Sequence, residues 1–140
     1  MATFMDFRVS TMKLGRRAYT ITVCGELDLF TCTELQEELS MLPSSVTRVL
    51  VDLSGVTFID STGIALLVKF ATRLQARGGG VVLVVADDSV RKLLRENLLE
   101  HLFEFRSPEE EPARYIVGLS LLDSLSGDAP LTRDARSLGA

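Results

Sequence analysis

The feature that most constrains the fold of this chain is the alternation of short apolar runs with longer segments of helical periodicity. Two runs, at residues 48–53 and 81–85, are dominated by valine and leucine, a pattern typical of strands that are covered on both faces. Strands that alternate with helices of about 10–15 residues predict parallel neighbours in one sheet. We therefore expect an α/β domain in which helices pack on the sheet.

The N-terminal part of the chain predicts an antiparallel pair of strands at the start of this sheet. Residues 7–10 and 18–23 are rich in β-branched and aromatic side chains, and the second run alternates with the period of two expected of a strand. Gly15-Arg16-Arg17 between them is typical of a hairpin turn. With a last strand predicted at 102–105, the sheet is mixed and has about five strands.

About four helices are expected to flank the sheet. They are predicted at residues 29–42, at 64–76, in a short segment capped by Asp88 and Ser89, and from Pro112 to about Leu125. Pro43 ends the first helix. The glycines at 78–80 supply the left-handed residue that is favoured at the C-terminus of the second.

Length and charge limit the class of protein. A chain of 140 residues fits one domain, which we expect over residues 1–125, and the change to glycine, proline, alanine and serine predicts a disordered tail over 126–140. The net charge of −4 argues against a non-specific nucleic-acid binder. No apolar run approaches the roughly 20 residues of a membrane span, and no signal peptide is visible. The sequence therefore predicts a cytoplasmic protein without a membrane or nucleic-acid partner.

Catalytic and metal-binding motifs are missing from the sequence. Two cysteines and one histidine, His101, do not make a metal cage, and the glycines at 78–80 are not followed by the Gly-Lys-Ser/Thr of a phosphate-binding loop. Ser61 is not in a Gly-x-Ser-x-Gly elbow. We expect no metal, no cofactor and no enzymatic activity. Cys24 is expected to be buried in a strand and Cys32 to be exposed on a helix.

The segment 58–64 carries the most informative side chains. It connects the strand predicted to end near Leu53 with the helix predicted to begin near Thr62. Asp60 or Ser61 is suited to cap this helix, and a phosphate on Ser61 would lie where a helix N-terminus stabilises an anion. Gly63 leaves the first turn without a Cβ, so that another chain can approach. The alternative interpretation is a simple helix cap without further function.

One face of the helix predicted at 64–76 is a candidate binding surface. Leu66, Phe70, Arg73 and Arg77 recur at helical spacing beside the apolar stripe that is expected to face the core. Apolar side chains next to arginines are typical of interfaces. The alternative is that Leu66 and Phe70 pack under a neighbouring helix and that the basic residues are only solvated.

Four short motifs occur in order and with compatible spacing between residues 7 and 125. They are Gly25-Glu26-Leu27-Asp28, then Asp60-Ser61-Thr62-Gly63 preceded by the run 51–56, then the glycine turn 78–80 leading into 81–86, and finally Ser89-Val90-Arg91-Lys92-Leu93-Leu94. Together they resemble the STAS-domain anti-sigma factor antagonists. The resemblance implies the STAS fold, a mixed sheet flanked by helices, in agreement with the order of elements read from the residues.

The resemblance also implies a phosphorylation switch. In this family the residue at the position of Ser61 is phosphorylated by a partner serine kinase, the anti-sigma factor, and the unphosphorylated antagonist binds that kinase and frees a sigma factor. Phosphorylation breaks the complex, and a serine phosphatase restores it. Thr62 is expected to be a secondary acceptor, and Asp28 a contact or positioning residue. The remaining residues expected to bind the partner are Asp60, Ser61, Thr62, Gly63, Leu66, Phe70 and Arg73.

Two other functions remain open from the sequence. The chain is also similar to STAS modules of stress-sensing scaffolds and of lipid-transport complexes, which act within larger assemblies. A small-ligand-binding regulatory domain would use a cleft formed by Asp28, Asp60 and Ser61. For the antagonist we expect a monomer or a weak dimer.

Overall fold

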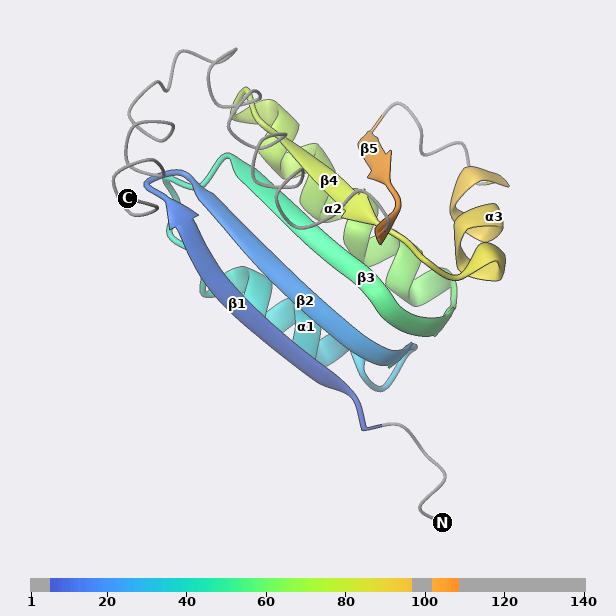
Figure 1. Cartoon of the computed structure of the whole chain (residues 1–140). Coiled ribbons are helices and arrows are strands. Elements are labelled where there is room, and N and C mark those ends of the chain that lie inside the picture. Colours follow the sequence, from blue (N-terminus) through green and yellow to red (C-terminus); the bar gives the residue numbers. More distant parts are fainter. Residues whose placement is uncertain (1–5, 97–101, 109–140) are drawn as a thin grey trace.

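The computed structural model describes residues 6–96 and 102–108 (Figure 1). Its strands and helices are β1 (Arg8–Gly15), β2 (Ala18–Leu27), α1 (Cys32–Ser40), β3 (Arg48–Ile59), α2 (Ser61–Ala76), β4 (Gly80–Val84), α3 (Asp88–Glu96) and β5 (Phe103–Arg106). The five strands form one sheet in the order β1-β2-β3-β4-β5. β1 is antiparallel to β2, and all other pairs are parallel. The predicted mixed α/β fold is therefore confirmed.

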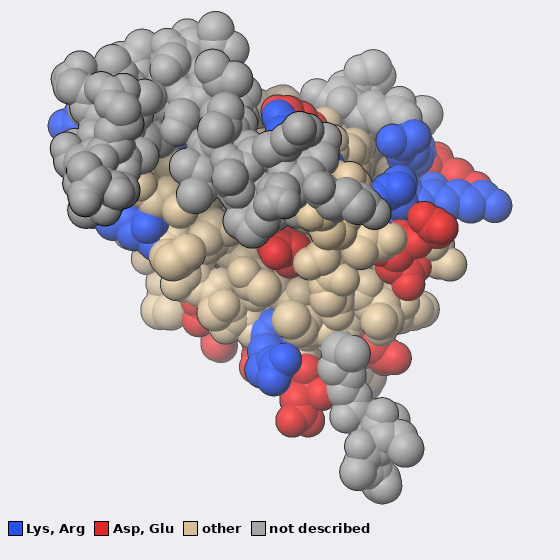
Figure 2. Space-filling view, viewed as in Figure 1, with Lys and Arg blue, Asp and Glu red and all other residues tan. Residues whose placement is uncertain are grey.

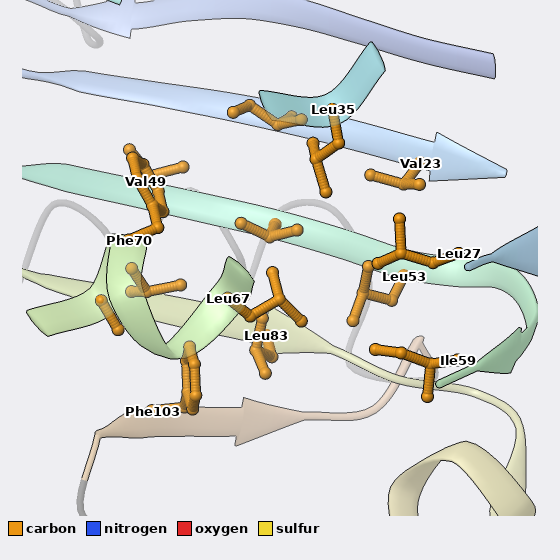
Figure 3. Close-up of a cluster of buried hydrophobic side chains, with 14 of the residues drawn as sticks. Val23, Leu27, Leu35, Val49, Leu53, Ile59, Leu67, Phe70, Leu83 and Phe103 are labelled. Atoms are coloured by element: carbon orange, nitrogen blue, oxygen red, sulfur yellow. The ribbon is translucent and has the colours of Figure 1, made fainter. Parts of the chain in front are cut away.

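The main core lies between the sheet and the two helices α1 and α2, which cover the same face (Figure 1). Figure 3 shows Leu35 of α1 and Leu67 of α2 directed towards side chains of β2, β3 and β4. Both leucines are almost completely buried. The helical periodicity of 64–76 thus identified the face of α2 that packs on the sheet, because residues three and four apart lie on one side of a helix.

The central strands carry buried apolar side chains on both faces, as predicted from their apolar sequences. Val49 and Val51 of β3 belong to the main core, whereas Leu50 lies in a second cluster together with Val82 and Val84 of β4. Successive side chains of a strand point to opposite faces. The second cluster therefore lies on the face of the sheet that α1 and α2 do not cover.

Strand β3 is longer than predicted and runs directly into the segment before α2. It ends at Ile59 rather than near Leu53, because β2 continues beside it as far as the pair Leu27–Ile59. Register shifts in this pairing accommodate the polar stretch after Leu53. The hydrogen-bond donors of Ser54 find a local partner, since its N–H and its hydroxyl both donate to Asp52 Oδ1, at 2.9 and 2.6 Å.

Two helix starts also differ from prediction. Helix α1 begins at Cys32 rather than at residue 29, because the residues before it form a turn described below. Helix α3 is capped by Asp87, whose Oδ1 accepts from Val90 N–H at 3.1 Å, and not by Asp88 or Ser89. The stop at Gly78 is confirmed, with φ of +83°, a conformation that glycine adopts without strain.

Several predicted features lie outside the described residues. These are His101, the helix from Pro112 to Leu125 and the tail at 126–140. Within residues 6–96 and 102–108, no helix is long and apolar enough to cross a bilayer. The described part holds three of the four predicted helices.

Candidate functional site

Asp60 caps helix α2 through one oxygen of its carboxylate. Its backbone is extended, and Oδ1 accepts from the N–H groups of Thr62 and Gly63 at 2.9 and 3.1 Å. Asp60 thus satisfies two of the amides that every helix N-terminus leaves without a partner. Ser61, the first residue of the helix, is exposed, and its hydroxyl is not needed for the cap.

The second oxygen of Asp60 binds the loop between β2 and α1. Asp60 Oδ2 accepts from Leu29 N–H at 3.2 Å, and Asp60 N–H donates to the carbonyl of Leu27 at 3.2 Å. The start of α2 and the residues that follow β2 are therefore joined through one side chain. Parallel strands bring their carboxyl ends to the same edge of the sheet, which explains this meeting of distant segments.

Asp28 organises the same loop from the other side. Its Oδ1 accepts from the N–H groups of Phe30 and Thr31, at 2.9 and 3.0 Å, and from the Thr31 hydroxyl at 3.1 Å. These bonds, that from the Thr31 amide above all, lower the pKa of Asp28 below its ordinary value. The structure thus gives Asp28 a positioning role in the turn that precedes α1.

Three exposed apolar side chains surround this junction, and the sequence interpretation missed them as a group. Leu29 is 61% exposed, Phe30 81% and Phe58 47%. We call them, together with Ser61, the loop surface. Leu29 and Phe30 project outward because the amides of Leu29, Phe30 and Thr31 are held by carboxylates. The signal that was available is the Asp28-x-x-Thr31 spacing, which is typical of a side-chain-stabilised turn and places the intervening residues on its outside.

Gly63 faces the interior, so the expectation that it provides an approach for another chain is wrong. A Cβ at this position would lie 2.9 Å from Ile59 Cγ1 and 3.0 Å from Leu27 Cγ. Glycine therefore allows the first turn of α2 to pack closely on the ends of β2 and β3. This packing places Ser61 and the cap of Asp60 at the edge of the sheet.

The predicted binding face of α2 is only partly accessible. Phe70 is 3% exposed and packs in the main core, as Figure 3 shows, so its assignment to the binding surface is wrong. Leu66 is half-buried, and Arg73 is exposed. Both line a small cavity of about 60 Å³ between α1 and α2, which also includes Lys69. Arg77 is directed elsewhere and donates to the carbonyl of Val46 at 3.1 Å.

Cys32 lies under the loop and is buried, so the prediction of an exposed thiol is wrong. Burial, with smaller contributions from the charges of Asp60 and Asp28, raises the pKa of this thiol to about 11. Cys32 is therefore protonated at neutral pH. Cys24 in β2 is half-buried rather than buried. Among residues 6–96 and 102–108, no group of histidine, cysteine and acidic side chains is arranged to hold a metal ion.

Comparison with known proteins places this chain in a family. The model of the family described as "Mlab, STAS domain" matches residues 10–104. The anti-sigma-B factor antagonist of Staphylococcus aureus (strain NCTC 8325 / PS 47) is 30% identical over 93 residues, which cover 66% of this chain and 86% of the relative. That of Listeria monocytogenes is 30% identical over 92 residues, or 65% of this chain and 81% of the relative.

Solved structures agree with this assignment at the level of the fold. The anti-sigma factor antagonist SpoIIAA in its unphosphorylated form superposes with a TM-score of 0.61 at 21% identity, covering 87% of this chain and 97% of its own. An anti-sigma factor antagonist from Mycobacterium paratuberculosis gives a TM-score of 0.68 at 18% identity, covering 81% and 94%. The chain belongs to the STAS-domain family of anti-sigma factor antagonists.

Proposed function

We propose that this protein binds an anti-sigma factor serine kinase in the cytoplasm, thereby releasing a sigma factor, and that phosphorylation of Ser61 ends the binding. The observation that carries the proposal is that two neighbouring residues have separate roles at the start of α2. Asp60 supplies the cap, and the adjacent Ser61 hydroxyl is exposed. A kinase can modify this hydroxyl without removing a hydrogen bond of the cap.

The charge of the phosphate explains why binding ends while the fold persists. A phosphoserine adds about −1.5 to −2 charges, and the N-terminus of α2 stabilises an anion at this position. The same phosphate lies next to the Asp60 carboxylate and at the edge of the apolar side chains of the loop surface. A partner that covers this surface must then desolvate the phosphate. A penalty of about 3 kcal/mol weakens binding by roughly a hundredfold.

The exposure of Ser61 also fits a reversible switch. A serine phosphatase that removes the group needs the same access as the kinase, and Ser61 is exposed in the unbound chain. Thr62, the proposed secondary acceptor, is half-buried, and its N–H is bound by Asp60. Ser61 is therefore the better acceptor of the two.

The test is a titration of the partner kinase from the same organism with four forms of the protein. Wild type and Ser61→Ala are expected to bind equally, whereas Ser61→Asp and the enzymatically phosphorylated protein bind at least tenfold more weakly. Ser44→Asp makes the same charge change at an exposed position in the turn before β3, and is expected to bind as wild type does. Equal affinity of all forms would contradict the switch.

Light scattering on the purified protein separates this function from the assemblies considered above. A monomer or a weak dimer is expected for an antagonist that exchanges partners. A stable large oligomer would favour the scaffold function instead. Stabilisation by nucleotides or other small ligands in a thermal melt would favour the ligand-binding domain.

A further inference from the structure

The small cavity between α1 and α2 combines an apolar floor with a basic rim. The residues that line it are Gln36, Leu39 and Ser40 of α1 and Leu66, Lys69, Phe70 and Arg73 of α2. Leu39 and Phe70 are buried and form the floor, whereas Lys69 and Arg73 are exposed. Both charged side chains that line the cavity are therefore positive.

The two cations have no neutralising partner in the described part of the chain, where their side chains make neither a hydrogen bond nor an ion pair. Lys69 and Arg73 are four residues apart on one helix, and like charges at this spacing destabilise it by a few tenths of a kcal/mol, about 0.2–0.5. The glutamates of α1 do not line the cavity, and Glu38 instead accepts from the Thr11 hydroxyl of β1 at 2.9 Å. An anion between the two cations removes their repulsion.

The end of α2 accounts for only one of these cations. A basic residue in the last turn of a helix is stabilised by the helix dipole, and Arg73 lies there. Lys69 lies a turn earlier, where the dipole contributes little. The pair is also not part of a generally basic surface, since Figure 2 shows the opposite face of the molecule with acidic and basic side chains next to one another.

The cavity lies within reach of a partner that covers the loop surface. At a rise of about 1.5 Å per residue, Lys69 and Arg73 lie about 12 and 18 Å from Ser61 along α2. A standard interface buries about 800 Å² on each partner, which corresponds to a patch about 30 Å across. One partner can therefore contact Ser61 and the cavity at the same time.

We propose that the cavity receives an acidic side chain of the anti-sigma factor kinase, with its carboxylate between Lys69 and Arg73. The inference rests on the proposed function and names a chemical feature of the partner. A guanidinium donates two parallel hydrogen bonds to a carboxylate, and an ammonium supplies further donors. A volume of about 60 Å³ suits a single side chain, and the apolar floor matches the methylene groups of a glutamate.

The test is a titration of that kinase with charge-reversal variants of the unphosphorylated protein. Lys69→Glu and Arg73→Glu are each expected to weaken binding about tenfold. Lys13→Glu makes the same change as the first variant at an exposed position of β1, and is expected to bind as wild type does. If Lys69→Glu and Lys13→Glu bind equally well, the cavity is not a contact and the inference is wrong.

Rates separate a seated carboxylate from long-range attraction. Lys69→Gln combined with Arg73→Gln removes both charges, and glutamine is as good a helix former as lysine and arginine, so the melting temperature is expected to stay unchanged. Loss of a paired charge inside an interface raises the dissociation rate, whereas loss of a charge at its rim lowers the association rate. We expect about tenfold faster dissociation. An effect confined to association would overturn the inference.

Compensation in the partner identifies the acidic residue. Kinase variants in which one surface Asp or Glu is changed to Lys are titrated with Lys69→Glu, and one of them is expected to restore binding. Restoration by none of them would contradict a direct pairing. Loss of self-association in light scattering, with kinase affinity unchanged, would assign the cavity to a second copy of the chain instead.

The outcomes also separate this inference from the function on which it rests. A kinase that does not bind wild type contradicts the proposed function, and the inference falls with it. A kinase that binds wild type, and releases the Ser61→Asp variant but not the Lys69→Glu variant, contradicts the inference alone.

Discussion

At the scale of single residues, the two aspartates at the edge of the sheet have distinct tasks. Asp60 connects the start of α2 with Leu29, and Asp28 holds the turn before α1. Neither carboxylate needs a partner protein to be positioned. The apolar side chains between them are then free to make contacts outside the domain.

Phe30 is expected to contribute to kinase binding without contributing to stability. It is 81% exposed, and truncation of a hot-spot side chain at an interface costs more than about 1 kcal/mol of binding free energy. Phe30→Ala should weaken binding about tenfold in a calorimetric titration while the midpoint of urea unfolding stays unchanged. Met41→Ala, at an exposed apolar residue at the far end of α1, is the control. Unchanged affinity of Phe30→Ala would remove this side chain from the interface.

The contribution of Asp28 to the free energy of unfolding is expected to depend on pH. Because its pKa in the folded chain is lowered from 3.8, the carboxylate stabilises the fold above the pKa of the unfolded chain, and this contribution is lost as the pH falls through the folded-state value. The free energy of unfolding of wild type should exceed that of Asp28→Asn at pH 6. The difference should shrink on acidification towards pH 2. A difference that stays constant over this range would contradict the assignment.

The cap and the exposed serine were predictable because local spacing decides them. Phe30 was missed because Leu29 fits a helical stripe, and only the hydrogen bonds of Asp28 show that the helix begins later. Phe70 was assigned to the surface because periodicity gives the angle around a helix but not which neighbour covers it. Here α1 packs beside α2, and the side of α2 that carries Phe70 is buried.

At the scale of elements, the ends of β2 and β3 decide where α2 begins. The second half of β3 was not predicted as a strand, because the residues after Leu53 are polar. In the structure it pairs with β2 through register shifts. A single sequence does not show such pairing, because the partner strand is far away along the chain. The length of β3 nevertheless places Asp60 beside the loop after β2.

Gly63 tests this junction directly. Gly63→Ala places a methyl group 2.9 Å from Ile59 Cγ1 and 3.0 Å from Leu27 Cγ, and overpacking of this kind costs about 1–3 kcal/mol. The helix propensity of alanine offsets up to about 1 kcal/mol of that cost. We expect a net loss of stability in chemical denaturation. Gly80→Ala, whose Cβ would meet no atom within 4 Å, is expected to be nearly neutral, and an equal effect of both variants would contradict the packing argument.

At the scale of the whole molecule, the sheet separates two surfaces. The loop surface lies at the carboxyl ends of β2 and β3, whereas the second cluster, Leu50, Val82 and Val84, lies on the face away from α2. The overall order of strands and helices was predictable because each hydrophobic period is local. The face of the sheet on which α1 and α2 pack was not predictable, since it depends on contacts between distant segments.

This separation predicts that phosphorylation acts locally. In a comparison of amide NMR spectra, phosphorylation of Ser61 should shift signals of residues 28–31 and 58–66 and leave those of β1 and β4 in place. The thermal midpoint should change by no more than a few degrees, because the phosphate lies at a helix N-terminus that tolerates it. Shifts throughout the sheet would indicate refolding instead of a local electrostatic change.

The carboxylate of Asp60, which joins two segments before any partner arrives, also has a consequence for the speed of exchange. A loop that is ordered in advance loses little conformational entropy on association. The partner then meets a rigid template and does not wait for a rare conformation. For the proposed switch we therefore expect partner exchange at a rate set by encounter and release, with each cycle of phosphorylation starting from the same ordered surface.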